Sequence, residues 1–134
     1  MKYLLDTNLC VEYIRGKNPH VIAHLRAHPA SDVSVCSVVV AELLHGAEKS
    51  HSPVSERAKV FAFVAPYFSF PFDDRCAEFY ASIRADLQRR GLLIGGYDML
   101  IAATARANQL TLVTHNTAEF SRIPGLTLVD WEVP

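Results

Sequence analysis

Short apolar runs alternate with longer helical patterns along the whole chain. The runs at 3–5, 33–36, 68–72, 110–114 and 126–131 have the length and the Val, Leu and aromatic content of buried strands. Helical patterns occupy 10–15, 20–27, 37–49, 53–65, 75–90 and 97–107, and a short helical turn begins at 117. Strands separated by helices indicate βαβ units. We therefore expect an α/β fold with a central, mainly parallel sheet of four to five strands between two helical layers.

Capping and breaking residues support these boundaries. Asn18-Pro19 predicts a capped helix start, and Asp73-Asp74 predicts another, for a long helix that Gly91 ends. Ser37 and Thr117 are the expected N-caps of the helices that follow them.

Composition places the chain among ordinary globular proteins. Its 134 residues are 50% apolar and 20% charged, so residues 1–134 are expected to form one domain with a substantial core. No apolar stretch approaches a membrane span and no signal-like N-terminus is present, which predicts a cytoplasmic protein without membrane association. Cys10, Cys36 and Cys76 are far apart and contain no CxxC pair, so we expect them to be small core residues.

Four polar residues interrupt otherwise apolar surroundings. Asp6 ends the first strand, Glu42 lies inside an apolar helix, Asp98 begins another, and Asn116 follows the strand at 110–114. Buried carboxylates without a partner are costly, so such acids either pair with cations or hold a metal. Oxygen ligands gathered from strand ends and helix starts suit Mg²⁺ or Mn²⁺.

Each of these residues also has a purely structural interpretation. Asp6 can be a helix N-cap, and Glu42 can pair with an arginine from another helix. Asp98 can be an acid stabilised by the dipole at a helix N-terminus, and Asn116 can be a turn residue. One metal site would account for all four together.

Four sequence blocks, in order, cover essentially the whole chain: YLLDTN, SVVVAELLHGA, LIGGYDMLIAATA and LVTHNTAEFSRIPGL. With these blocks the chain resembles the PIN-domain ribonucleases and, within them, the VapC toxins of type II toxin–antitoxin pairs. The resemblance implies a three-layer α/β/α fold with a catalytic acidic site on Asp6, Glu42 and Asp98. Its fourth position falls on Asn116, where many relatives have Asp.

The resemblance also implies a function. A protein of this kind is a Mg²⁺- or Mn²⁺-dependent endoribonuclease that cleaves structured RNA, commonly tRNA or rRNA, and arrests translation. A cognate VapB-type antitoxin neutralises it, in a larger toxin–antitoxin hetero-oligomer. The aromatic-rich stretch at 61–72 adds the expectation of a homodimer, because so short a chain exposes more apolar surface than one core hides.

Neighbouring polar residues are candidates for supporting roles. Some are expected to orient the acids, although capping explains the hydroxyls equally well: Thr7, Ser37, Thr114 and Glu119. Others are candidate RNA contacts, although a solvated helix face is the favoured interpretation of any one of the arginines: Arg15, Lys17, Arg84, Arg106 and His115.

Other features favour blander interpretations. His20, His24 and His28 recur at helical spacing, but no HExxH glutamate accompanies them, so solvated surface histidines are expected rather than a zinc site. A phosphotransferase of the haloacid-dehalogenase kind needs a lysine before its last acidic loop, and no lysine follows Lys59. A PIN-like module that binds without cutting is the other alternative. Three acids kept among apolar residues disfavour it.

Overall fold

The computed structural model describes residues 1–134 and contains a parallel sheet of five strands. These are β1 (Tyr3–Leu5), β2 (Val33–Cys36), β3 (Phe68–Phe70), β4 (Thr111–Val113) and β5 (Leu128–Val129). Their order across the sheet is β3-β2-β1-β4-β5, and every neighbouring pair is parallel. The expected parallel sheet is confirmed.

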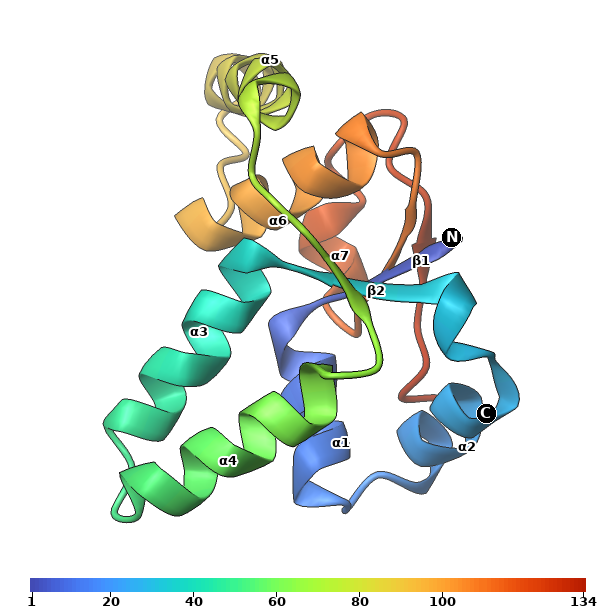
Figure 1. Ribbon diagram of the computed structural model, residues 1–134. Coiled ribbons are helices and arrows are strands. Elements are labelled where there is room, and N and C mark those ends of the chain that lie inside the picture. Colours follow the sequence, from blue (N-terminus) through green and yellow to red (C-terminus); the bar gives the residue numbers. More distant parts are fainter.

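Helices cover both faces of this sheet, which gives the three-layer α/β/α arrangement expected from the sequence. They are α1 (Thr7–Arg15), α2 (Pro19–Ala27), α3 (Ser37–Glu48), α4 (Pro53–Val64), α5 (Asp74–Arg90), α6 (Gly96–Ala107) and α7 (Thr117–Phe120), with a 3-10 turn at Ala30–Asp32. Helix α1 contacts α2, α3 and α4, whereas α5 packs across α6 (Figure 1). None of the helices combines the length and apolar character that a membrane span requires.

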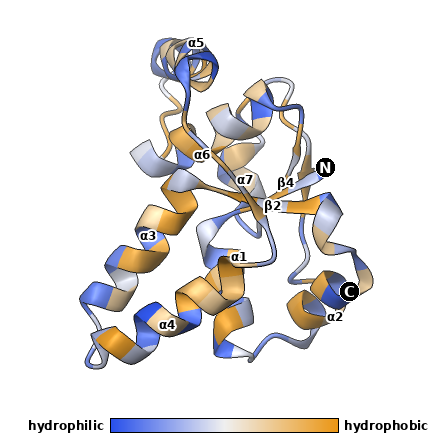
Figure 2. Cartoon of the chain, viewed as in Figure 1, coloured by the Kyte–Doolittle hydropathy of each residue, from blue (hydrophilic) through white to orange (hydrophobic).

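The core lies between the sheet and its helices. All four residues of β2 are buried, as are Leu4 and Leu5 of β1. Strands covered on both faces have no solvent side, so they lack the alternating pattern of an exposed sheet. Helix α3 is hydrophobic over most of its length, whereas α5 shows many hydrophilic positions (Figure 2). The three cysteines are buried and unpaired, as expected.

Several boundaries follow the predicted signals. Asn18 caps α2 through its side chain, with Pro19 as the first helical residue. Asp73 accepts the backbone N–H of Cys76 at the start of α5, and Gly91 ends that helix with a φ of 67°. Glycine suits this left-handed conformation because it has no side chain to clash.

Other boundaries were predicted wrongly. Helix α1 begins at Thr7 rather than at residue 10, because the Asp6 side chain accepts the N–H of Leu9 and starts the helix there. Ser37 and Thr117 are not N-caps but first helical residues, and the positions before them are taken by Cys36 and Asn116. The last strand is limited to Leu128–Val129.

The strand order determines where a site can form. The chain passes from β1 to β2 and β3 on one side, and then crosses over to β4 and β5 on the other side of β1. Polar residues that follow β1 and β4 therefore meet at the point where the winding direction reverses. In open α/β sheets this point is the usual place for a ligand site.

Candidate active site

Asp6 is the most enclosed acid of the candidate site. It follows β1, is only 4% exposed, and accepts a 2.8 Å hydrogen bond from the backbone N–H of Leu9. Burial raises its pKa from 3.8 to about 6, although the Thr114 hydroxyl and the Leu9 N–H partly oppose this shift. The N-cap interpretation is therefore correct, and the same carboxylate also faces the charges of Asp98 and Glu132.

Glu42 projects from the middle of α3 and is held by α1. The Thr7 hydroxyl donates a 2.7 Å hydrogen bond to Oε1 of Glu42. The alternative that Glu42 pairs with an arginine is wrong, because Glu42 takes part in none of the ion pairs of the molecule. Its carboxylate is held by a neutral donor and has no cationic partner.

Asp98 brings a third carboxylate from the first turn of α6. Half-burial raises its pKa, and the negative charges of Glu42 and Glu119 raise it further. Asp98 in turn raises the pKa of Asp6. The three acids therefore interact electrostatically although β1, α3 and α6 are distant in sequence.

Asn116 reaches the same region from the loop after β4. Its side-chain amide donates a 3.0 Å hydrogen bond to Oε2 of Glu119, and its backbone N–H donates to the Thr114 hydroxyl at 3.0 Å. Glu119 faces the acids, since its charge acts on Asp98. Thr7, Thr114 and Glu119 thus each contact a candidate site residue.

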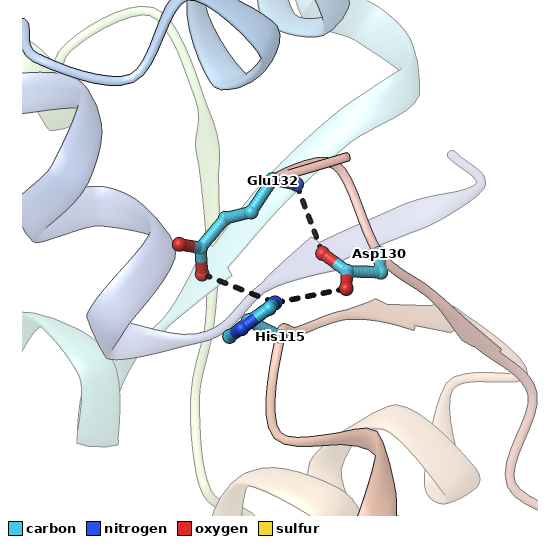
Figure 3. A group of neighbouring side chains, drawn as sticks. All are labelled: His115, Asp130 and Glu132. Atoms are coloured by element: carbon cyan, nitrogen blue, oxygen red, sulfur yellow. Dashed lines mark hydrogen bonds and ion pairs between the residues drawn. The ribbon is translucent and has the colours of Figure 1, made fainter. Parts of the chain in front are cut away.

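A second polar cluster lies beside these acids. Nδ1 of His115 is 2.9 Å from Oδ2 of Asp130 and 4.0 Å from Oε2 of Glu132 (Figure 3). The hydrogen bond to Asp130 and the charge of Glu132 raise the pKa of His115. This is the only group of at least three His, Cys, Asp or Glu side chains whose ligand atoms all lie within 4.8 Å of one another, so the donors of Asp6, Glu42 and Asp98 are more widely spaced.

The segment that carries Asp130 and Glu132 is held in place by the buried side chain of Trp131. Trp131, which lies between the two acids in sequence, is 2% exposed and packs against the rings of Tyr3, His24 and His28. The expectation of solvated surface histidines is wrong for His24 and His28, because both rings stack on Trp131. Nothing in the linear pattern pairs α2 with a residue about a hundred positions later.

A groove of about 950 Å³ opens over this region. Residues of α1, α3 and α4 line it, together with Tyr97, His115, Asn116 and Glu132. Of the predicted RNA contacts, Arg15 and His115 line the groove. No pattern in the sequence singled out Tyr97, Asp130 or Glu132.

The remaining predicted residues lie elsewhere. The Ser37 hydroxyl donates to the carbonyl of Phe70 at 3.4 Å, which ties α3 to β3 rather than orienting an acid. Arg84 donates to the Tyr80 hydroxyl, and Lys17 is exposed outside the groove. Arg106 donates to the carbonyl of Pro124 and lies over the Phe79 ring, so it is engaged in holding a loop.

Comparison with known proteins identifies the family. The PIN domain family model matches residues 3–126. The chain is 37% identical over 131 residues to "tRNA(fMet)-specific endonuclease VapC" of Salmonella typhimurium, with 98% of both chains covered. It is also 37% identical over 134 residues to "Ribonuclease VapC2" of Rickettsia felis, and this match covers 98% of this chain and 99% of the relative.

Solved structures agree with the sequence comparison. The structure of DNA-bound VapBC from Salmonella typhimurium superposes with a TM-score of 0.93 at 37% identity over 98% of both chains. VapBC2 from Rickettsia felis, bound to a DNA fragment from its promoter, gives a TM-score of 0.91 at 35% identity, over 98% of this chain and 99% of that one. The resemblance drawn from the four sequence blocks is confirmed, and the chain belongs to the PIN domain family, among the VapC ribonucleases.

Proposed function

We propose that residues 1–134 act as one catalytic domain, a divalent-metal-dependent endoribonuclease toxin that cleaves structured RNA and so arrests translation. The main support is the meeting of Asp6, Glu42 and Asp98 at the switch point of the sheet, with no cation paired to any of them. Partly buried carboxylates without a cationic partner lower the stability of the folded state, so the fold itself gives no reason for them. They are expected where a cation and a phosphate are to be bound.

The chemistry of the donor atoms suits Mg²⁺ or Mn²⁺, although the carboxylates would have to draw closer together to share one ion. Asp6, Glu42 and Asp98 offer carboxylate oxygens. Asn116 offers its side-chain amide oxygen, because its –NH₂ group already donates a hydrogen bond to Glu119. A divalent ion bound by these oxygens would supply Lewis-acid activation of water and would offset the charge developing on the phosphate.

The chain's own residues supply position. Asp6 is fixed by the Leu9 N–H and Glu42 by the Thr7 hydroxyl, so neither carboxylate is free to rotate away. A water oxygen would bond to phosphorus as the bond to the 3′ oxygen breaks, which leaves a 5′-phosphate and a 3′-hydroxyl. The RNA 2′-hydroxyl is not needed as a nucleophile. His115 is a poor general base, because the Asp130 carboxylate favours its protonated form.

A tRNA or an rRNA loop is the proposed substrate. The Salmonella relative, which aligns over 98% of both chains, is named for cleavage of tRNA(fMet). A "Toxin FitB" from Neisseria gonorrhoeae, 35% identical over 126 residues, supports the toxin assignment. A VapB-type antitoxin is the proposed partner, since the similar solved structures are VapBC complexes.

The test is cleavage of bulk tRNA and rRNA by the purified chain. We expect cleavage with Mn²⁺ or Mg²⁺, none with EDTA, and products that carry a 5′-phosphate. Asp98→Asn should lose more than about 100-fold in rate, the upper range for residues that only orient a ligand. Glu12→Gln, in an acid that lines the groove on α1, is the matched control and should remain active. Cleavage by Asp98→Asn at the wild-type rate would refute the catalytic assignment.

A further inference from the structure

Tyr97 differs from every other tyrosine of the chain in having no partner. It is 63% exposed, whereas the exposed phenylalanines Phe61 and Phe68 reach 46% and 50%. The other four tyrosines each pack against a further aromatic ring: Tyr3, Tyr13, Tyr67 and Tyr80. Tyr97 makes no aromatic contact, and its hydroxyl has no hydrogen-bond partner in the protein. The fold therefore makes little use of this ring.

The ring lies beside the candidate active site. Tyr97 precedes Asp98 in the first turn of α6 and lines the same groove as Glu42 and Asn116. Gly95 and Gly96 come directly before it, and the space next to Gly96 is open. An aromatic side chain is thus presented to the groove that Glu42 and Asn116 also line.

A nucleobase is the ligand that this position suits. The surrounding carboxylates repel the phosphates of RNA, so affinity has to come from the bound cation or from uncharged contacts. A base has an uncharged flat face that stacks on an aromatic ring, and stacking tolerates an acidic environment. A free tyrosine ring supplies the apolar face, and it lines the same groove as Glu42 and Asn116, beside which the reacting phosphate is proposed to bind.

We propose that Tyr97 is a stacking platform for the base adjacent to the cleaved phosphodiester. This rests on the proposed ribonuclease function and adds the residue that positions the substrate. Tyr97 contributes to RNA affinity and to the choice of the cut, and it takes no part in the chemical step.

The experiment pairs protein variants with a modified RNA. A synthetic stem-loop spanning the cut mapped in bulk tRNA is compared with the same stem-loop made abasic at the nucleotide next to the cut. Tyr97→Leu should raise KM about tenfold with little change in kcat, a size typical of one lost base stack. Tyr97→Phe keeps the ring and should behave as wild type. Phe61→Leu, at an exposed aromatic outside the groove, should have no effect.

The abasic stem-loop supplies the readout that a structural role would not move. The KM of the wild-type chain for the abasic stem-loop should rise by about the factor by which Tyr97→Leu raises the KM for the normal stem-loop. The KM of Tyr97→Leu should be the same for both stem-loops. Independent, additive losses would overturn the inference. So would an unchanged KM for Tyr97→Leu accompanied by an altered oligomer mass or antitoxin affinity, which would assign the ring to a protein contact.

A binding arm separates this inference from the proposed function. Anisotropy of a labelled stem-loop is measured with Asp6→Asn alone and with Asp6→Asn combined with Tyr97→Leu. Failure of the wild-type chain to cut any RNA would overturn the proposed function. Equal binding by the two variants would overturn the role of Tyr97 whether or not the wild-type chain cuts RNA, and weaker binding by the double variant would support it.

Discussion

The hydroxyl of Thr7 donates a 2.7 Å hydrogen bond to Oε1 of Glu42 and thereby joins the first turn of α1 to the middle of α3. The two residues are 35 positions apart in sequence. Because Asp6 directly precedes Thr7, this bond fixes the position of Glu42 relative to the buried carboxylate at the end of β1. Two of the three acids therefore share one rigid connection.

Replacing Thr7 with Val should release Glu42 while keeping the shape of the side chain. We expect metal affinity to fall 10- to 100-fold, the range seen when a residue that orients a metal ligand is lost. Thr7→Ser retains the hydroxyl and should restore most of the affinity. Calorimetric titration of Mn²⁺ into the three forms measures this. Equal affinities would mean that Glu42 is held by other contacts.

Asp6 makes the stability of the metal-free protein depend on pH. Its pKa is raised from 3.8 to about 6, so the folded state holds this proton more tightly than the unfolded chain. The free energy of unfolding should consequently fall as pH rises from about 4 to about 6, and the loss should persist above that. Asn has no charge to bury and can still accept the Leu9 N–H. Asp6→Asn should therefore be more stable than wild type at about pH 7.5, by roughly 1–3 kcal/mol.

Urea unfolding in EDTA at about pH 4 and pH 7.5 tests this. The advantage of Asp6→Asn should vanish at the lower pH, and added Mn²⁺ should stabilise wild type more than the variant. A pH-independent difference between the two proteins would indicate a packing effect rather than a buried charge.

The fold, and the acids as candidates for a site, could be inferred from the sequence because their signals are local. Asp6 directly follows an apolar strand, and Glu42 interrupts an apolar helix, so each stands out within a few residues. The sheet order then brings them together without any further sequence signal. Ser37 shows the limit of local signals, since a serine at a helix start can be the cap or the first helical residue.

Contacts between distant segments could not be predicted. The Nε2–H of His24 donates to the carbonyl of Val133, 109 positions away, and no periodicity links these residues. The contact of His115 with Asp130 has the same character. Arg106 appeared equally available for RNA in the sequence, and only the packing against Phe79 and Pro124 reveals its structural use.

Asn116→Asp should strengthen metal binding and weaken the metal-free fold. The amide of Asn116 donates to Glu119, so an aspartate there would replace a 3.0 Å hydrogen bond with two facing carboxylates. We expect a loss of roughly 1.5–3 kcal/mol of stability in EDTA, the range for a broken hydrogen bond to a charged group, and tighter Mn²⁺ binding. Glu119→Gln removes a charge at the same place and should bind Mn²⁺ more weakly. Unchanged Mn²⁺ binding in both variants would place residues 116 and 119 outside the metal shell.

The homodimer remains a prediction from the exposed aromatic side chains of α4 and β3. Phe61 and Phe68 are both exposed, and β3 is an edge strand of the sheet. Burial of these rings against a second copy would remove them from water. Phe68→Glu should therefore shift the mass in light scattering from dimer to monomer at micromolar concentration. Val54→Glu, at an exposed apolar site outside the aromatic stretch, should leave the mass unchanged. A monomeric wild-type chain would contradict the prediction.

The uncompensated acids also predict how an antitoxin inhibits the enzyme. A guanidinium offers a planar fork of donors that matches a carboxylate, so one arginine of the partner can pair with these acids. Such an arginine and a divalent cation would compete for the same oxygens. Raising Mn²⁺ should then weaken inhibition of RNA cleavage by the cognate antitoxin. Replacing that single arginine with lysine should raise the inhibition constant, because lysine is a point charge without the fork. Inhibition that is independent of Mn²⁺ and insensitive to every Arg→Lys change in the antitoxin would mean that the partner blocks the groove without entering the acidic site.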